Sequence, residues 1–266
     1  MNVKLLISII LCFHSVIFSQ DYVKVEFGNG TSNLSNFSMQ VNERDFSGLI
    51  QIKRLKSTLR NMDIEFSEDY NNEYVKVLLG VVSASADGIL ITGGENSETV
   101  SIEIGKISYA LNDWDLFVTD QGPRGIPTMS AKLNIQNVNI KPPNKMVQGL
   151  NQDEWRIFNF LTGGDGALDI KKVSAEIDLN NNGKFTMKGN LDLPIGKAIA
   201  TATMSMGRDF QTEPYLDVFQ LNITNLSPDV KSFMDEMVRS GDMPLKKKGS
   251  GYTLRMSGDI DNPRIY

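Results

Sequence analysis

The feature that most constrains the fold is a unit of strand-like residues that occurs twice without a gap, at 52–67 and at 104–119. In both copies large apolar residues alternate with polar ones, which is the period of a β-strand with one covered face. The corresponding apolar positions are Leu55, Leu59, Met62, Ile64 and Phe66 in the first copy and Ile107, Leu111, Trp114, Leu116 and Val118 in the second. A weaker third copy covers 129–140. Repeated units of this kind must bury their apolar faces against their neighbours or against a ligand.

In the two stronger copies the alternation is interrupted by one step of three residues, for example between Leu111 and Trp114. The apolar residues stay on one face only if an extra residue is accommodated there, either by a bulge within a long strand or by a tight turn between two strands. The sequence leaves both alternatives open. Between the copies, 74–82 and 88–92 are predicted to be separate strands around a turn at 86–88, and the polar stretch 28–36 is predicted to connect two further strands.

These patterns predict a mainly β protein, an elongated, curved antiparallel sheet of repeated strand units with two short helices at about 151–162 and 228–240. Asn151 is a suitable N-cap for the first helix, whose Trp155, Phe158 and Leu161 share one face. We expect that face to belong to the core and the helix to plug one end of the sheet. The second helix is predicted to begin at Ser227-Pro228.

The first residues have the order of a secretory signal peptide. Lys4 is the only charge before an apolar run from Leu5 to Phe18, and small Ser19 follows. An uncleaved anchor and a lipid-modified Cys12 are the alternatives. We therefore expect a signal peptide at 1–19, a repetitive β half at 20–145 and a second β half at 146–266, the two halves forming one continuous domain.

The composition of the 266-residue chain narrows the chemistry. The only Cys and the only His are Cys12 and His14, so a chain cleaved after Ser19 would have no residue for a His or Cys metal site, a Cys-His nucleophile or a disulfide. The net charge is −5, and the basic clusters are small, so a nucleic-acid partner is not expected. We predict no catalytic residues, no cofactor and no enzymatic activity.

Two patterns remain as candidates for ion binding or acid–base chemistry. Asp178, Asn180 and Asn182 match the first positions of a calcium loop, but Gly189 stands where such a loop needs a bidentate Glu, and Asn182-Gly183 favours a hairpin turn. Carboxylate pairs such as 113 with 115 and 259 with 261 resemble acid–base pairs, although pairs of this kind are expected by chance in an acidic chain.

The residues most suited to contact an apolar ligand are those of the predicted apolar face. The candidates are Trp114, Leu116, Ala198, Ala200, Ala202 and Met204. The alanines form a run of small side chains that would allow a helix, a second sheet or an acyl chain to approach closely.

The C-terminal third carries a resemblance. The segment from Phe185 to Pro194, the run from Leu221 to Ser227-Pro228 before a short helix, and the final strand from Tyr252 with Gly258 and Pro263 in its last turn look like the end of type II secretion system protein N. They also resemble the related AsmA-like envelope proteins.

The resemblance implies a non-enzymatic protein on the periplasmic side of the cell envelope, with a largely antiparallel sheet and a role in protein secretion or lipid movement. The expected function is binding along an apolar sheet face. The expected partners are envelope or secretion-machinery proteins, with lipid acyl chains as a further candidate ligand. The alternative is a structural or interaction subunit of an outer-membrane or secretion assembly, with a filled core and no lipid ligand.

Overall fold

The computed structural model describes residues 22–43, 46–69, 72–95, 98–120, 122–125, 127–164, 166–180, 182–205 and 214–266. The signal peptide expected at 1–19, with Cys12 and His14, lies outside these residues. The strands are β1 (Tyr22–Phe27), β2 (Gly30–Asn42), β3 (Phe46–Asp69), β4 (Asn72–Glu95), β5 (Glu98–Thr119), β6 (Gly122–Pro123), β7 (Thr128–Lys141), β8 (Leu168–Leu179), β9 (Lys184–Leu193), β10 (Gly196–Ser205), β11 (Tyr215–Thr224), β12 (Lys246–Lys248), β13 (Gly251–Asp259) and β14 (Arg264–Ile265). The helices are α2 (Asn144–Gln148), α3 (Gln152–Thr162) and α4 (Pro228–Ser240).

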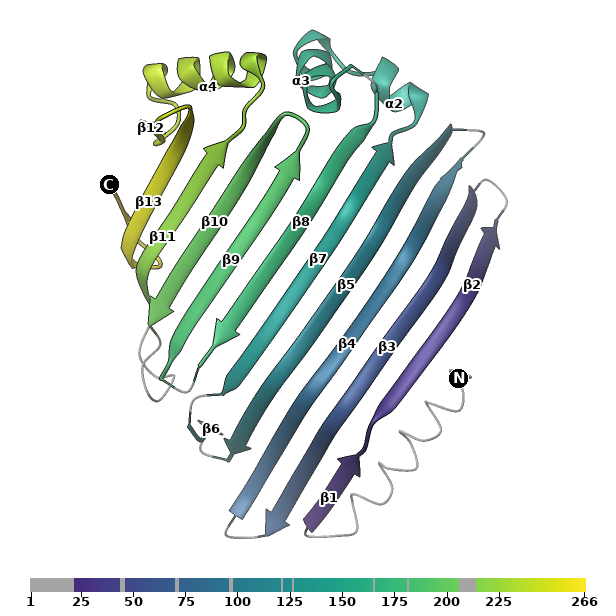
Figure 1. The fold of residues 1–266 in the computed structure, drawn as a ribbon, viewed down its shortest axis with the longest axis vertical. Coiled ribbons are helices and arrows are strands. Elements are labelled where there is room, and N and C mark those ends of the chain that lie inside the picture. The colour runs from purple at the N-terminus through teal and green to yellow at the C-terminus, as the bar shows by residue number, and fades with distance from the viewer. Residues whose placement is uncertain are drawn as a thin grey trace.

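In the described part of the chain all fourteen strands belong to one open antiparallel sheet, which confirms the predicted fold class. The order is β1-β3-β4-β5-β7-β8-β9-β10-β11-β13-β12, with β2 beside β3, β6 beside β5 and β14 beside β13. Strands β3 and β4 have 24 residues each, so their extended length is about 80 Å. The helices lie at one end of the strands (Figure 1). Strand β7 pairs directly with β8, so the sheet continues across the boundary expected at 145–146.

The sheet is a single layer. Among the described residues only a few apolar side chains are buried, and the helices reach only one end of the sheet. Most of the sheet therefore has no second layer over it.

The interrupted alternation is accommodated inside long strands. A row of residues crosses the sheet where the regular pairing skips one position; this first slip row consists of Asn36, Lys53, Gly88, Gly105, Asn137 and Lys171. On alternate strands Asn36, Gly88 and Asn137 have φ of 54°, 61° and 53°. A positive φ changes the direction of the next side chain, so the apolar residues on both sides of the row can share one face.

A second slip row lies further along the strands and consists of Asn61, Gly80 and Asp113. Asn61 and Asp113 have φ of 52° and 53°. Gly80 lies between them, and a Cβ on it would come within 3.1 Å of the Asn61 Cβ. The step between Leu111 and Trp114 is therefore an irregularity within the continuous strand β5, and the alternative of a tight turn is wrong.

Two local predictions are corrected. Segments 74–82 and 88–92 are not separate strands, because β4 runs through Asp87-Gly88 and Gly88 occupies the first slip row. Most of the polar stretch 28–36 is also strand rather than connection, because β2 begins at Gly30 and pairs with β3 from Gly30↔Leu59 onwards. In both cases pairing with a neighbouring strand outweighs the local preference for a turn.

Helix α3 is confirmed, with the predicted N-cap. The Asn151 Oδ1 accepts from the Glu154 backbone N–H, and a Glu154 carboxylate oxygen accepts from the Asn151 N–H, both at 2.9 Å. The expectation that its apolar face is core is wrong in part, because Trp155 is 44% exposed and Leu161 is also exposed. Helix α2 was not predicted; it has five residues and no buried ones.

Helix α4 is confirmed, and it covers the end of the sheet near β13. Pro228 occupies its first turn, and Gly241 ends it with φ of 84°. Val230 and Met234 of α4 pack with Tyr252 of β13, which is 2% exposed. Partly buried residues complete this cluster: Phe160, Ile195, Ile223, Leu226, Val238, Met243 and Leu245. The main described core thus lies at one end of the sheet.

Candidate binding face

One face of the sheet is apolar from edge to edge. The clearest example is a line of cross-strand partners from β2 to β13, which we call the long apolar row: Leu34, Leu55, Ala86, Ile107, Ile135, Val173, Leu191, Ala198, Ile223 and Tyr252. Directly paired residues of a sheet lie on the same side, so all ten share one face. We call this side the apolar face.

Further rows parallel to the long apolar row extend the same face. On the other side of the first slip row the partners are Phe37, Ile52, Ile89, Ile104, Val138 and Ile170. Towards the other end of the strands they are Leu59, Val82, Leu111, Ala131, Ile177, Met187, Ala202, Phe219, Met256 and Ile265. The two slip rows thus preserve a surface that the strand period alone would have divided.

The opposite face is polar. Its cross-strand partners include Lys132 with Glu176 and Lys172 with Asp192, which bring unlike charges together. The Asn139 Nδ2 donates to Asp169 Oδ1 on the neighbouring strand at 2.6 Å. The sheet therefore has one side suited to water and one side suited to apolar groups.

Trp114 and Leu116 lie on the apolar face of β5. Their partners on β4 are Leu79 and Val77, and Leu79 is buried. Ala198, Ala200, Ala202 and Met204 lie on the same face of β10, and three strands, β7, β8 and β9, separate the two groups. The candidate residues therefore share a face without forming one compact site.

The alanines of β10 are flanked by larger side chains. Ala202 lies between Met187 of β9 and Phe219 of β11 and is only 5% exposed. Because no other layer covers β10 in the described part of the chain, these neighbours must provide most of its cover. The small side chains accommodate large ones within the sheet, and they do not by themselves form a groove.

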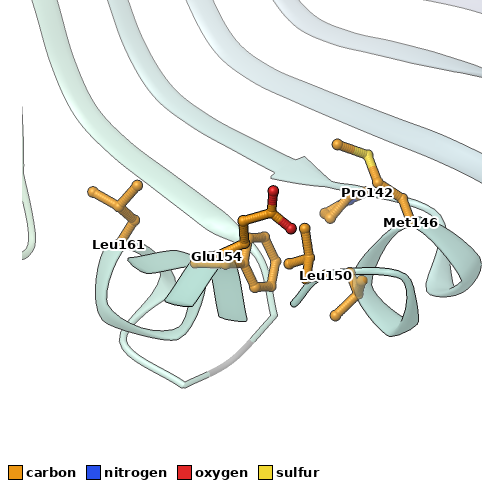
Figure 2. A pocket seen from close by; sticks show the side chains of 7 residues that line it. Pro142, Met146, Leu150, Glu154 and Leu161 are labelled. Atoms are coloured by element: carbon orange, nitrogen blue, oxygen red, sulfur yellow. The ribbon is translucent and has the colours of Figure 1, made fainter. Parts of the chain in front are cut away.

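Two hollows of the described residues have mainly apolar linings. One, of about 300 Å³, lies at the end of β2–β5, and its lining includes Met39, Phe46, Ile50, Ile91 and Ile102. The other, of about 230 Å³, lies between α2 and α3 (Figure 2). It is lined by Pro142, Met146, Val147, Leu150, Glu154, Phe158 and Leu161.

The hollow between the helices explains where part of the α3 apolar face points. Phe158 and Leu161 of α3 meet Met146 and Leu150 from the α2 side there, while Glu154 brings a carboxylate to the lining. The α2 contribution was missed because a five-residue helix is too short for a periodic signal to be recognised.

Two of the calcium candidates, Asn180 and Asn182, lie at the turn between β8 and β9 that Asn182-Gly183 predicts. The Asn180 Oδ1 accepts from the backbone N–H groups of Asn182 and Lys184, both at 3.1 Å. Gly183 has φ of 72°, and Asp178 lies in β8 opposite Ser130 and Thr186. The Asn180 oxygen is therefore already engaged in shaping the turn.

The carboxylate pairs do not gather into larger acidic groups. Asp113 belongs to the second slip row, and its backbone carbonyl accepts from the Thr128 hydroxyl at 2.9 Å. Asp259 ends β13 and lines a small depression with Tyr215 and Arg264. Among the described residues, no group of three or more His, Cys, Asp or Glu side chains is placed to hold a metal ion.

The most perturbed titratable group belongs to the α4 contact. The Tyr252 hydroxyl donates to Asp235 Oδ1 at 2.8 Å, and Lys247 Nζ donates to the same oxygen at 2.8 Å. Burial, together with the hydrogen bond to Asp235, raises the pKa of Tyr252 to about 12. The hydrogen bonds from Lys247 and Tyr252 lower the pKa of Asp235. This cluster joins α4 to β12 and β13.

No family model, curated protein or solved structure matches the chain. Within the residues that the structure describes, no helix is both long enough and apolar enough to cross a membrane.

Proposed function

We propose that this is a non-enzymatic, exported protein of the cell envelope that binds lipid acyl chains along its apolar face and so assists lipid transport or protein secretion. The observation that carries the proposal is the apolar face itself. It extends without a polar row from β2 to β13, yet the helices cover only one end.

An open apolar face is costly in water, so a protein that maintains one over most of its sheet is expected to bring it against apolar material. The sheet is about ten strands wide along the long apolar row, which corresponds to about 43 Å at ~4.8 Å per strand. An extended acyl chain fits such a surface because contact between aliphatic groups needs no specific polar partner.

The order of residues 1–19 supports export, and the resemblance of the C-terminal third to type II secretion system protein N and AsmA-like proteins supports a periplasmic location. The hollow at the end of β2–β5 lies on the apolar face, and the hollow between α2 and α3 is a second apolar place where a chain end could be held.

The proposal is tested by expressing the chain with its own N-terminal segment, purifying the exported protein and analysing its organic extract by mass spectrometry. We expect co-purified lipid and saturable binding of a fluorescent fatty acid. A protein that is lipid-free and takes up no fatty acid would refute the proposal.

A matched pair of variants connects binding to the face. Leu133 lies on the apolar face of β7 between Tyr109 and Ala175, and the adjacent Asn134 points to the polar face. Leu133→Lys places a charge among apolar groups, so we expect about tenfold weaker fatty-acid binding. Asn134→Lys should leave binding unchanged. Equal effects of the two variants would show that binding does not use the apolar face.

A further inference from the structure

The outer edge of β2 is the least protected edge of the sheet. Within the described residues β2 pairs with β3 on one side, and no strand lies on its other side. About half of its N–H and C=O groups therefore point outwards. All thirteen residues of β2 are exposed, and none is charged or is proline.

The opposite edge is protected in the way that natural sheets usually are. There β13 is partly covered by β12, which consists of Lys246, Lys247 and Lys248, and by the two-residue strand β14. Short strands and lysines discourage pairing with another sheet, whereas a long uncharged edge with apolar side chains favours it. Leu34 and Met39 of β2 are 43% and 44% exposed.

We propose that two copies of this chain pair antiparallel along β2, about a two-fold axis between Ser35 and Asn36. Pairing of identical edges closes the assembly at two copies, whereas β2 does not fit the other edge, where β12 offers only three residues. The inference does not depend on lipid binding.

The register follows from the need to keep apolar residues on one face. With the axis between Ser35 and Asn36, Phe37 of each copy lies opposite the partner copy's Leu34. The other pairs on this face combine a large residue with a small one: Met39 with Ser32 and Val41 with Gly30. The pairs on the polar face are Ser35 with Asn36, Asn33 with Ser38 and Thr31 with Gln40, so no charge meets another. A shift by one residue would place Phe37 opposite a polar residue.

This arrangement continues both the apolar face and the first slip row. Asn36, at which the row reaches β2, lies next to the axis in both copies. The long apolar row, which ends at Leu34, would continue through the partner copy's Phe37.

The test uses the full chain, expressed with its own N-terminal segment, with Cys12→Ser in every variant. Ser35→Cys places two thiols on one face with Cα atoms about 6 Å apart, within the range of a disulfide. Ser38→Cys, on the same strand and face, places them about 17 Å apart. We expect oxidation with diamide to join the Ser35→Cys chains into covalent dimers and to leave the Ser38→Cys chains separate.

Light scattering after size-exclusion chromatography measures the mass independently. We expect a dimer for the unmodified chain. For Ser35→Lys, which brings two like charges together, we expect a dimer dissociation constant at least tenfold larger. Thr99→Lys, at an exposed position of β5 that β3 and β4 separate from β2, should remain dimeric. A monomer at tens of micromolar, equal cross-linking of both Cys variants, or a different protein recovered on β2 would each overturn the proposal.

Discussion

The slip rows predict an inverted preference for side chains at Asn137. In an ordinary strand position, valine is favoured over asparagine and glycine is unfavourable. Asn137 has φ of 53°, where a residue with a branched Cβ is strained and glycine is not. We therefore expect Asn137→Val to destabilise the protein and Asn137→Gly to be nearly neutral.

The magnitude follows from the backbone and from the neighbouring strand. The left-handed conformation costs about 1–2 kcal/mol for residues other than Gly, Asn and Asp. Space is also limited, because a Cβ on Gly105 would lie 3.0 Å from the Asn137 Cβ, so the side chain at 137 lies against the β5 backbone. We expect Asn137→Val to lower the free energy of unfolding by about 1–2 kcal/mol. For Asn137→Gly the relief of strain and the entropy of the unfolded chain nearly cancel, to within about 0.5 kcal/mol.

Thermal unfolding followed by circular dichroism measures these differences. A change of 1 kcal/mol corresponds to about 2–4 °C in Tm for a domain of this size, so Asn137→Val should melt about 2–8 °C below the unmodified chain. Asn134 is the control, because it lies in the same strand with regular partners, Ser108 and Ser174. There valine should be neutral or stabilising and glycine should cost about 0.5–1 kcal/mol. The same rank order at both positions would refute the role assigned to the slip rows.

Three further predictions concern single contacts. Tyr252→Phe should lower the free energy of unfolding by about 1 kcal/mol at neutral pH, because the hydrogen bond to Asp235 is lost. This advantage of tyrosine over phenylalanine should disappear as the pH rises from 10 to about 12, because the tyrosine of the unfolded chain loses its proton at a lower pH than that of the folded chain. Chemical denaturation of both proteins measures the difference, and an advantage that is unchanged up to pH 12 would contradict this prediction. Asn180→Ala should lower stability by about 1 kcal/mol to the same extent in calcium and in EDTA, and a loss seen only in calcium would favour the metal loop. Gly251→Ala should fail to fold or lose several degrees in Tm, because the new Cβ would collide with the Ile223 carbonyl oxygen, and an unchanged Tm would contradict this placement.

The sequence was sufficient to predict the class of fold and most strands, because apolar residues that alternate with a period of two are compatible with few structures other than β-strands with one covered face. It could not decide how the alternation slips. A bulge and a turn both restore the face, and Asp87-Gly88 is a turn signal when read locally. What decides the matter is the alignment of Gly88, Gly105 and Asn137 on neighbouring strands, which only the pairing reveals.

Prediction of the edge strand and of the candidate binding face from the sequence was limited in the same way. Residues 28–36 have the composition of a connection, and β2 forms there because β3 supplies a partner over its whole length. The sequence singled out Trp114 and the alanines of β10 as ligand contacts. The structure places them on one face but far apart, because position across a sheet depends on the number of strands between two segments and not on their own composition.

Strand order along the sheet follows chain order almost throughout, and this order affects how the protein unfolds and folds. From β3 to β11 each strand pairs with strands that are close to it in the chain, so the sheet is close to a one-dimensional array. A chain that emerges from its N-terminus can add one hairpin after another, without waiting for distant segments. Hydrogen exchange should accordingly show protection that differs from strand to strand, rather than one opening of the whole sheet.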